Sequence, residues 1–153
     1  MTGQKPRQIA AQVLLDYIQR VDFVENLLDA ELSQASLPAP DRALAQELTF
    51  GVVRWQATLD WLIAQKTDRR PQRPVLQVLL RLGLYQKFWL ERIPDYAIVD
   101  TTVELARQLG AAQQSGFVNA VLRRCLREHE AIERQLADLK QAIGSGSDGN
   151  ATR

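Results

Sequence analysis

The residues best suited to binding chemistry lie in one short segment, residues 116–127, where an aromatic side chain is followed by several arginines. Phe117 offers a flat apolar face on which a nucleic-acid base can stack. Arg123, Arg124 and Arg127 follow it, and a guanidinium group donates paired hydrogen bonds to phosphate oxygens. If the segment begins a helix, its first backbone N–H groups also favour an anion. The pattern predicts contact with RNA.

A helical projection of this segment, at about 100 degrees per residue, separates it into two faces. The apolar face carries Val118, Val121, Leu122, Cys125 and Leu126. The opposite face carries Ala120 and the three arginines, and Phe117 falls between the two faces beside Arg124. We therefore expect a helix that buries one side and presents arginines on the other. The alternative, that Phe117 is packed and the arginines are merely solvated, stays open.

Residues outside this helix complete the candidate RNA-binding set. Lys5 and Arg7 stand at the N-terminal end of the first expected helix, where a flexible basic arm can contact RNA. Asn119 is expected to hydrogen-bond locally, as asparagine often does near helix starts, and is kept in the set beside the arginines. The candidate RNA-binding residues are Lys5, Arg7, Phe117, Asn119, Arg123, Arg124 and Arg127.

A second basic segment follows the third expected helix. Residues 67–74 contain Arg69, Arg70 and Arg73, show no periodicity and include two prolines, which predicts an exposed loop. Whether this loop takes part in binding is left open by the sequence.

No arrangement of residues predicts catalysis, a metal or a cofactor. The chain has no nucleophile elbow, no HExxH and no Walker lysine. Residues 144–149 match GxGxxG, but a helix precedes them and only four residues follow, so the strand and helix that make this motif bind dinucleotides are missing. Cys125 is the only cysteine and His129 the only histidine, which excludes a Cys/His zinc site. The spacing of Cys125 predicts a buried side chain rather than a reactive thiol.

The composition suits one folded domain with its own core, since the 153 residues are 46% hydrophobic and 24% charged. The net charge is only +1, so basic residues must act through their placement. Residues 1–7 lead into a polar helix and not into the apolar core of a signal peptide. The apolar run 75–90 includes Gln77, Arg81 and Lys87 and is too short to span a bilayer. We expect a cytoplasmic protein with no membrane partner.

Apolar residues recur at helical spacing along most of the chain, and no segment alternates as a strand does, which predicts an all-α fold. The expected helices cover residues 7–20, 25–34, 42–66, 75–90 and 94–110, with a last one that begins at Gln113 or Ser115.

Two of these helices have features that bear on packing. Gly51 lies inside the third, where it is either a kink or a point of close helix packing. Residues 75–90 are apolar on most sides, as in the central helix of a bundle. One domain is expected over residues 1–143, followed by a disordered tail or linker remnant over residues 144–153 that is rich in Gly, Ser, Asp and Asn.

Taken together, several motifs between residues 5 and 128 make the chain resemble the NusB-like RNA-binding domain. This domain occurs alone as transcription antitermination factor NusB and as the N-terminal domain of Sun/RsmB-type 16S rRNA cytosine-5 methyltransferases. The motifs are Asp41-Arg42, Glu47-Leu48, residues 51–54, Leu59-Asp60, residues 80–86, Ile93-Pro94, residues 103–106 and residues 116–124. The resemblance implies about seven helices in two small subbundles, and RNA contact through Phe117 and Arg7.

Three details favour the methyltransferase branch of this family over free NusB. They are Arg54, Gln86, and the arginines that follow Val121-Leu122, where NusB proteins tend to carry an acid. The chain departs from the family at Asp100-Thr101, where Asn-Glu is frequent, so a role carried by that acidic position is not transferred. Cytosine-5 transfer also needs a cysteine thiolate and an α/β domain for S-adenosylmethionine, and neither is found in this sequence.

The resemblance therefore implies an RNA-binding domain that is not an enzyme by itself. Its expected partner is RNA, either 16S rRNA or its precursor, with a methyltransferase catalytic domain or a ribosomal protein as further partners. One alternative is a stand-alone antitermination factor that binds the leader RNA of ribosomal operons together with a ribosomal protein. The other is a helical protein-docking module that binds no RNA.

Overall fold

The computed structural model describes residues 4–19, 22–90 and 93–151, with side chains described as far as Ile143. Within these residues the chain forms eight α-helices and one short 3-10 helix, and no strand, which confirms the all-α prediction. The elements are α1 (Gln4–Gln19), α2 (Val24–Gln34), α3 (Ala39–Arg54), α4 (Gln56–Lys66), α5 (Pro74–Phe88), α6 (Asp95–Gln108), η1 (Ala112–Gln114), α7 (Ser115–Arg127) and α8 (His129–Ala151).

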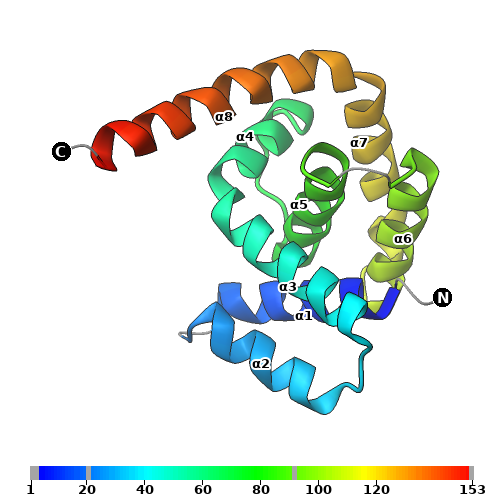
Figure 1. Cartoon of the computed structure of the whole chain (residues 1–153). Coiled ribbons are helices and arrows are strands. Elements are labelled where there is room, and N and C mark those ends of the chain that lie inside the picture. Colours follow the sequence, from blue (N-terminus) through cyan, green and yellow to red (C-terminus); the bar gives the residue numbers. More distant parts are fainter. Residues whose placement is uncertain (1–3, 20–21, 91–92, 152–153) are drawn as a thin grey trace.

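Helix α5 is the centre of the fold, as the sequence predicts. It contacts α1, α3, α4, α6 and α7, and every residue from Val78 to Gln86 is buried. Figure 1 shows α5 between α3 and α4 on one side and α6 and α7 on the other, with α1 and α2 below. A helix in this position has neighbours all round, so an apolar side chain stabilises the fold at almost every position.

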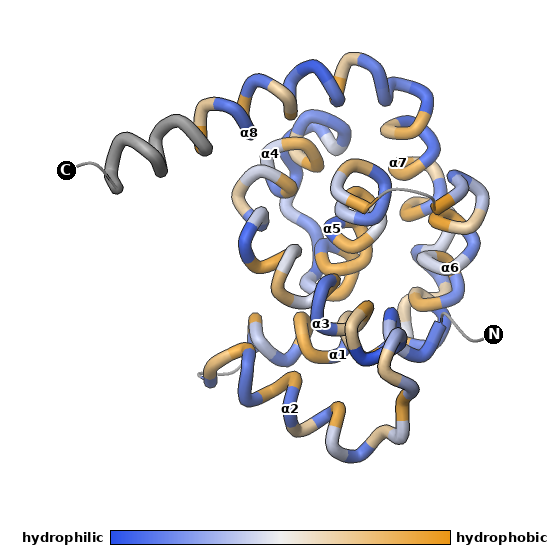
Figure 2. Tube along the Cα trace, in the orientation of Figure 1, coloured by the Kyte–Doolittle hydropathy of each residue, from blue (hydrophilic) through white to orange (hydrophobic). Residues whose placement is uncertain are grey.

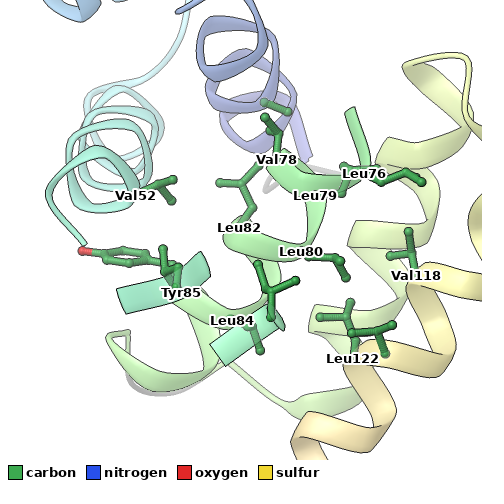
Figure 3. Close-up of a cluster of buried hydrophobic side chains, with 14 of the residues drawn as sticks. Val52, Leu76, Val78, Leu79, Leu80, Leu82, Leu84, Tyr85, Val118 and Leu122 are labelled. Carbon is green, nitrogen blue, oxygen red and sulfur yellow. The ribbon is translucent and has the colours of Figure 1, made fainter. Parts of the chain in front are cut away.

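Leucines and valines of α5 fill the space between these neighbours. In Figure 3, Val118 and Leu122 of α7 lie near Leu80 and Leu84 of α5, while Val52 of α3 lies on the other side of the helix. Gly83 allows α7 to come close, because a Cβ atom built on it would lie 2.7 Å from a methyl carbon of Leu122. Figure 2, coloured by hydropathy, shows many apolar residues on α5.

The buried side chains form a large cluster around α5 and a smaller one under α2. The smaller cluster joins α1, α2 and α3 through Ile9, Val13, Val24, Leu28, Leu32 and Ala45. Val53 packs against both clusters and connects them. This arrangement agrees with the two small subbundles that the resemblance implies.

The predicted long helix over residues 42–66 is wrong, because the chain bends at Trp55 and forms α3 and α4. Gly51 is not the break. A Cβ atom on Gly51 would overlap the ring of Tyr85, so this glycine allows close packing of α3 against α5. The bend instead brings the Trp55 ring to 5.4 Å from the Trp89 ring, a contact between residues far apart in the sequence. Neither glycine nor proline marks position 55.

The two ends of the chain also differ from the sequence prediction. Helix α1 begins at Gln4, with Pro6 in its first turn where proline is tolerated, so Lys5 belongs to the helix and not to a flexible arm. The predicted end of this helix at residue 20 lies outside the described residues. Past residue 115 the chain forms two helices, α7 and α8, that meet at Glu128.

Helix α8 runs through Ala151, so its backbone crosses the predicted domain boundary after residue 143. Residues 152–153 lie outside the described part of the chain, and the assignment of residues 144–153 as a tail stays a prediction. The GxGxxG match at residues 144–149 lies inside this helix and does not follow a strand. Over the described residues, no helix combines the length and the apolar character needed to cross a membrane.

Candidate nucleic-acid interface

Helices α6 and α7 are neighbours because the chain reverses between them at Gly110. This glycine has φ of 78°, the left-handed conformation predicted for the cap of the preceding helix. The backbone N–H of Ala111 then donates to the carbonyl of Ala106 at 2.7 Å, which closes the end of α6. The 3-10 turn η1 follows and leads directly into α7, which packs against α6 and α5.

The two predicted faces of α7 are confirmed. Val118, Val121, Leu122 and Cys125 are buried against the core, and Arg123, Arg124 and Arg127 are exposed on the other side. Phe117 is 37% exposed at the first turn of the helix. Part of the ring is therefore accessible for stacking, and its role in RNA contact stays a prediction.

The three arginines of α7 differ in their partners. Nε of Arg123 donates to Oδ1 of Asn119 at 2.8 Å, one turn earlier on the helix. Asn119 therefore bonds locally, as predicted, and fixes the side chain of Arg123. Arg124 lies 3.6 Å from a carboxylate oxygen of Glu128. Among the described residues, Arg123 and Arg127 have no carboxylate partner.

Glu128 belongs to a small charge network at the junction of α7 and α8. Its carboxylate accepts a hydrogen bond from Nζ of Lys66 at 2.5 Å, and Lys66 is the last residue of α4. This bond, with the charges of Lys66, Arg124 and Arg127, lowers the pKa of the Glu128 carboxyl group below its ordinary value. The network fixes the C-terminal end of α4 beside the C-terminal end of α7.

The N-terminal end of α1 contacts α6. The side-chain amide of Gln4 donates to the backbone carbonyl of Thr101 on α6 at 3.3 Å, and Lys5 is exposed beside it. Gln4, Asn119 and Arg123 line one cavity of about 600 Å³, which we call the α6–α7 cavity. The structure thus places the first turn of α1, which carries Lys5, beside α6 and the cavity that Asn119 and Arg123 line.

Arg7 has a different environment from the other candidates. It is partly buried, and its Nε donates to Oε1 of Gln86 at 2.7 Å, which ties α1 to the end of α5. Burial lowers the pKa of its guanidinium group below its ordinary value. This arginine holds two helices together, and its side chain is less accessible than that of Lys5.

Sequence reasoning missed the contribution of α6 to this site. Asp100, Glu104 and Arg107 line the α6–α7 cavity, and Arg107 is an exposed cation 3.4 Å from Glu104. In the sequence these residues form the polar face of an amphipathic helix, which is the same pattern as an ordinary solvated face. Only the packing of α6 beside α7 shows that this face borders the arginines.

Cys125 is buried, as predicted, and burial raises the pKa of its thiol to about 11. Burial thus favours the protonated thiol over the thiolate form that a nucleophile requires. His129 is partly exposed and lies 3.5 Å from Glu133. In the described part of the chain, no group of three or more potential metal ligands gathers.

The fold defines a class of all-helical domains in which one central helix is surrounded by its neighbours and a smaller cluster of helices adjoins them. The chain belongs to the NusB family, whose profile matches residues 4–127. The matched residues end with α7, and α8 follows them.

Curated relatives with similar sequences are methyltransferases. The probable ribosomal RNA small subunit methyltransferase B of Synechocystis sp. is 39% identical over 140 residues, which is 90% of this chain and 31% of that protein. The ribosomal RNA small subunit methyltransferase B of Pseudomonas putida is 38% identical over 129 residues, 83% of this chain and 29% of that protein. The chain therefore spans about a third of the length of these relatives.

Solved structures with the same fold include NusB itself. T. maritima NusB aligns with a TM-score of 0.73 at 22% identity, over 82% of this chain and 90% of that chain. A chain from a crystal structure of NusB and NusE in complex with dsRNA aligns with a TM-score of 0.72 at 21% identity, over 88% of this chain and 97% of the other. At these identities the likeness concerns the fold.

Proposed function

We propose that this chain is an RNA-binding domain that recognises 16S rRNA or its precursor, and that it has no catalytic activity by itself. The observation that carries the proposal is the outer side of α7, where an exposed Phe117 stands on the same helix as three outward arginines. The similarity to ribosomal RNA methyltransferases supports 16S rRNA as the target.

Each candidate residue has a separate part in the proposed contact. Phe117 provides a stacking surface for an unpaired base. Arg123 and Arg127 meet phosphate groups, and Asn119 holds the guanidinium of Arg123 in position. Arg124 also meets a phosphate group, after it separates from Glu128. Lys5 adds an exposed cation next to Gln4, which lines the α6–α7 cavity.

Arg7 acts in this proposal mainly through position. Its bond to Gln86 keeps the first turn of α1, which carries Lys5, beside the end of α5. Replacing Arg7 should therefore change both stability and RNA affinity, whereas replacing Lys5 should change affinity alone.

The proposal also states that this chain does not catalyse methyl transfer by itself. The chain matches about 30% of the relatives' length, and methyl transfer in those proteins would require residues outside the matching part. The one thiol described here is buried, and burial raises its pKa to about 11. We propose that this domain contributes binding, and that a methyltransferase domain with its own S-adenosylmethionine site is its functional partner.

The test is a binding titration of the full chain with fluorescent single-stranded fragments of 16S rRNA at moderate salt. Phe117→Ala combined with Arg124→Ala should weaken binding roughly tenfold to a hundredfold, because one stacked base contributes about 1 to 3 kcal/mol. The matched control is Phe23→Ala with Arg134→Ala, which removes an exposed aromatic and an exposed arginine elsewhere. Equal affinity in both variants and in the unchanged chain would refute the site.

A second candidate function is a stand-alone antitermination factor. One observation favours it: the structural alignment covers 90% to 97% of solved NusB chains, so this chain contains nearly all of a free-standing NusB. The higher sequence identity to the methyltransferases favours the first function. Recovery of a ribosomal protein together with leader RNA in a pull-down would support the second function, and recovery of a methyltransferase domain would support the first.

A further inference from the structure

The connection between α4 and α5 is a second basic surface outside α7. It carries Arg69, Arg70 and Arg73, all exposed, within residues 67–73, and we call it the arginine loop. In the part of the chain that the structure describes, none of these three arginines has an ion-pair partner. Their positive charge is therefore directed to the solvent.

The arginine loop has a defined backbone conformation. Asp68 and Arg69 have φ of 52° and 60°, in the left-handed region that side-chain-bearing residues rarely adopt. The backbone N–H of Arg69 donates to the carbonyl of Ala64 at 2.9 Å, and that of Arg70 donates to Thr67 at 3.0 Å. The amide of Gln72 donates to the carbonyl of Arg70 at 2.9 Å. These bonds hold the loop against the end of α4, so its arginines project from a fixed base.

Two arginines of the loop line a cavity of about 310 Å³ together with a third, Arg81 of α5. The only acidic residue in the lining is Asp60, and its carboxylate already has partners. Arg81 donates to both of its oxygens, at 2.7 and 2.9 Å, and Gln77 donates to one of them at 2.7 Å. Because Asp60 is engaged in this way, the positive charges of Arg69 and Arg70 stay available to an external anion.

This loop begins near the C-terminal end of α7. It starts directly after Lys66, whose ammonium group meets Glu128 at the end of α7. Arg124 is bound to the same carboxylate. Helix α7 has thirteen residues and is about 20 Å long at 1.5 Å per residue, so Phe117 stands at one end of the helix and the contact of Lys66 with Glu128, where the loop starts, at the other.

We propose that the arginine loop binds phosphate groups of the same RNA strand that stacks on Phe117, an inference that rests on the proposed function. The strand runs along the outer side of α7, and phosphates at its far end meet Arg69 and Arg70. The chemistry of the loop favours a polyanion over a protein surface. It presents guanidinium groups and no exposed large apolar side chain, whereas the centre of a protein interface is usually apolar.

The test compares two double variants of the full chain. Arg69→Gln with Arg70→Gln removes two charges from the arginine loop. The control, Arg42→Gln with Arg134→Gln, removes two exposed charges from α3 and α8. A third variant, Arg69→Lys with Arg70→Lys, keeps the charge and loses the paired donors. The probes are single-stranded RNAs of about 12 and about 4 nucleotides, chosen from the range of known site sizes. Thermal unfolding verifies that each variant is folded.

Each phosphate contact on a single strand adds about 0.7 to the slope of affinity against salt on logarithmic axes. Loss of two contacts should therefore reduce the slope by roughly 1.4 and weaken binding of the longer RNA about 25-fold at about 0.1 M salt. Binding of the shorter RNA, which reaches only the Phe117 end, should change little. The control should keep the slope, and the lysine variant should keep most of it.

The outcomes separate this inference from the proposed function. If the unchanged chain binds RNA and the Phe117 variant does not, but Arg69→Gln with Arg70→Gln binds normally, the loop inference is overturned and the proposed function stands. An equal loss for the short and long RNAs would also overturn it, because the loop would then act through general charge. If the unchanged chain binds no RNA at all, both proposals fail.

Discussion

The clearest test of the packing around α5 is the substitution Gly51→Ala. Gly51 lies inside α3, and by helix propensity alone alanine should stabilise the protein by about 1 kcal/mol. The structure predicts the opposite sign, because the new Cβ atom would overlap the ring of Tyr85. The ring cannot easily move away. It stacks on Trp89 at 5.6 Å between centroids, and its hydroxyl donates to Glu47 at 3.0 Å.

The magnitude follows from three contributions. Overpacking of a filled core costs about 1 to 3 kcal/mol, and overlap with a rigid ring falls in the upper part of that range. Displacement of the Tyr85 hydroxyl from Glu47 costs about 1 kcal/mol more. The gain in helix propensity offsets about 1 kcal/mol. We therefore expect Gly51→Ala to lower the free energy of unfolding by roughly 2 to 3 kcal/mol.

Urea unfolding followed by circular dichroism measures this change. Gly116→Ala is the matched control, since nothing lies within 4 Å of a Cβ atom at that position in α7, and it should be neutral or slightly stabilising. In a Tyr85→Leu background, Gly51→Ala should lose most of its effect, because the ring that it meets is gone. A stabilising effect of Gly51→Ala in the unchanged chain would refute the close-packing explanation.

Three other predictions concern charged and polar groups. Because the pKa of Glu128 is lowered in the folded protein, its bond to Lys66 stabilises the fold above pH 4.5, the ordinary pKa of glutamate. This contribution is lost as the pH falls through the lower pKa of the folded state. Glu128→Gln should therefore make the urea midpoint less sensitive to acid below pH 4.5. Cys125 should resist a thiol reagent at pH 8 in the native protein and react at once in denaturant, and rapid native labelling would contradict its burial. Asp60→Ala should destabilise the protein by about 2 kcal/mol in urea unfolding, since it leaves the buried Arg81 without its carboxylate partner. This cost is smaller than that of breaking a fully buried pair, because Asp60 is partly exposed. An unchanged urea midpoint would contradict this reasoning.

The sequence predicts elements whose signal is local. The apolar and basic faces of α7 follow from the spacing of Val118, Val121 and Leu122 against the arginines, and the left-handed cap follows from Gly110. The bend at Trp55 has no such signal, because it depends on a contact with Trp89 that forms only after the chain has folded back. Tertiary packing decides such positions, and local propensity does not.

The same distinction applies to the candidate site. The sequence identifies Phe117 and the arginines of α7 from their residue types and spacing. It does not reveal that Gln4 and Arg107 border the same cavity, because their place beside α7 depends on how α1 and α6 pack. For Arg7, the chemistry of the residue type suggests a surface contact, while the fold uses its guanidinium to hold Gln86. The roles of all the candidate residues in RNA binding stay predictions.

The enclosure of α5 has a consequence for how the domain opens. Since α5 contacts five other helices, separating any one of them exposes part of its apolar surface to water. Partial opening is therefore costly, and we expect the backbone amides of α5 to exchange with deuterated solvent only when the whole domain unfolds. In the described part of the chain, α2 packs mainly on α1 and α3, and α8 mainly on α7, so their amides should exchange through smaller openings. Protection against exchange should thus fall from the centre of the bundle outward.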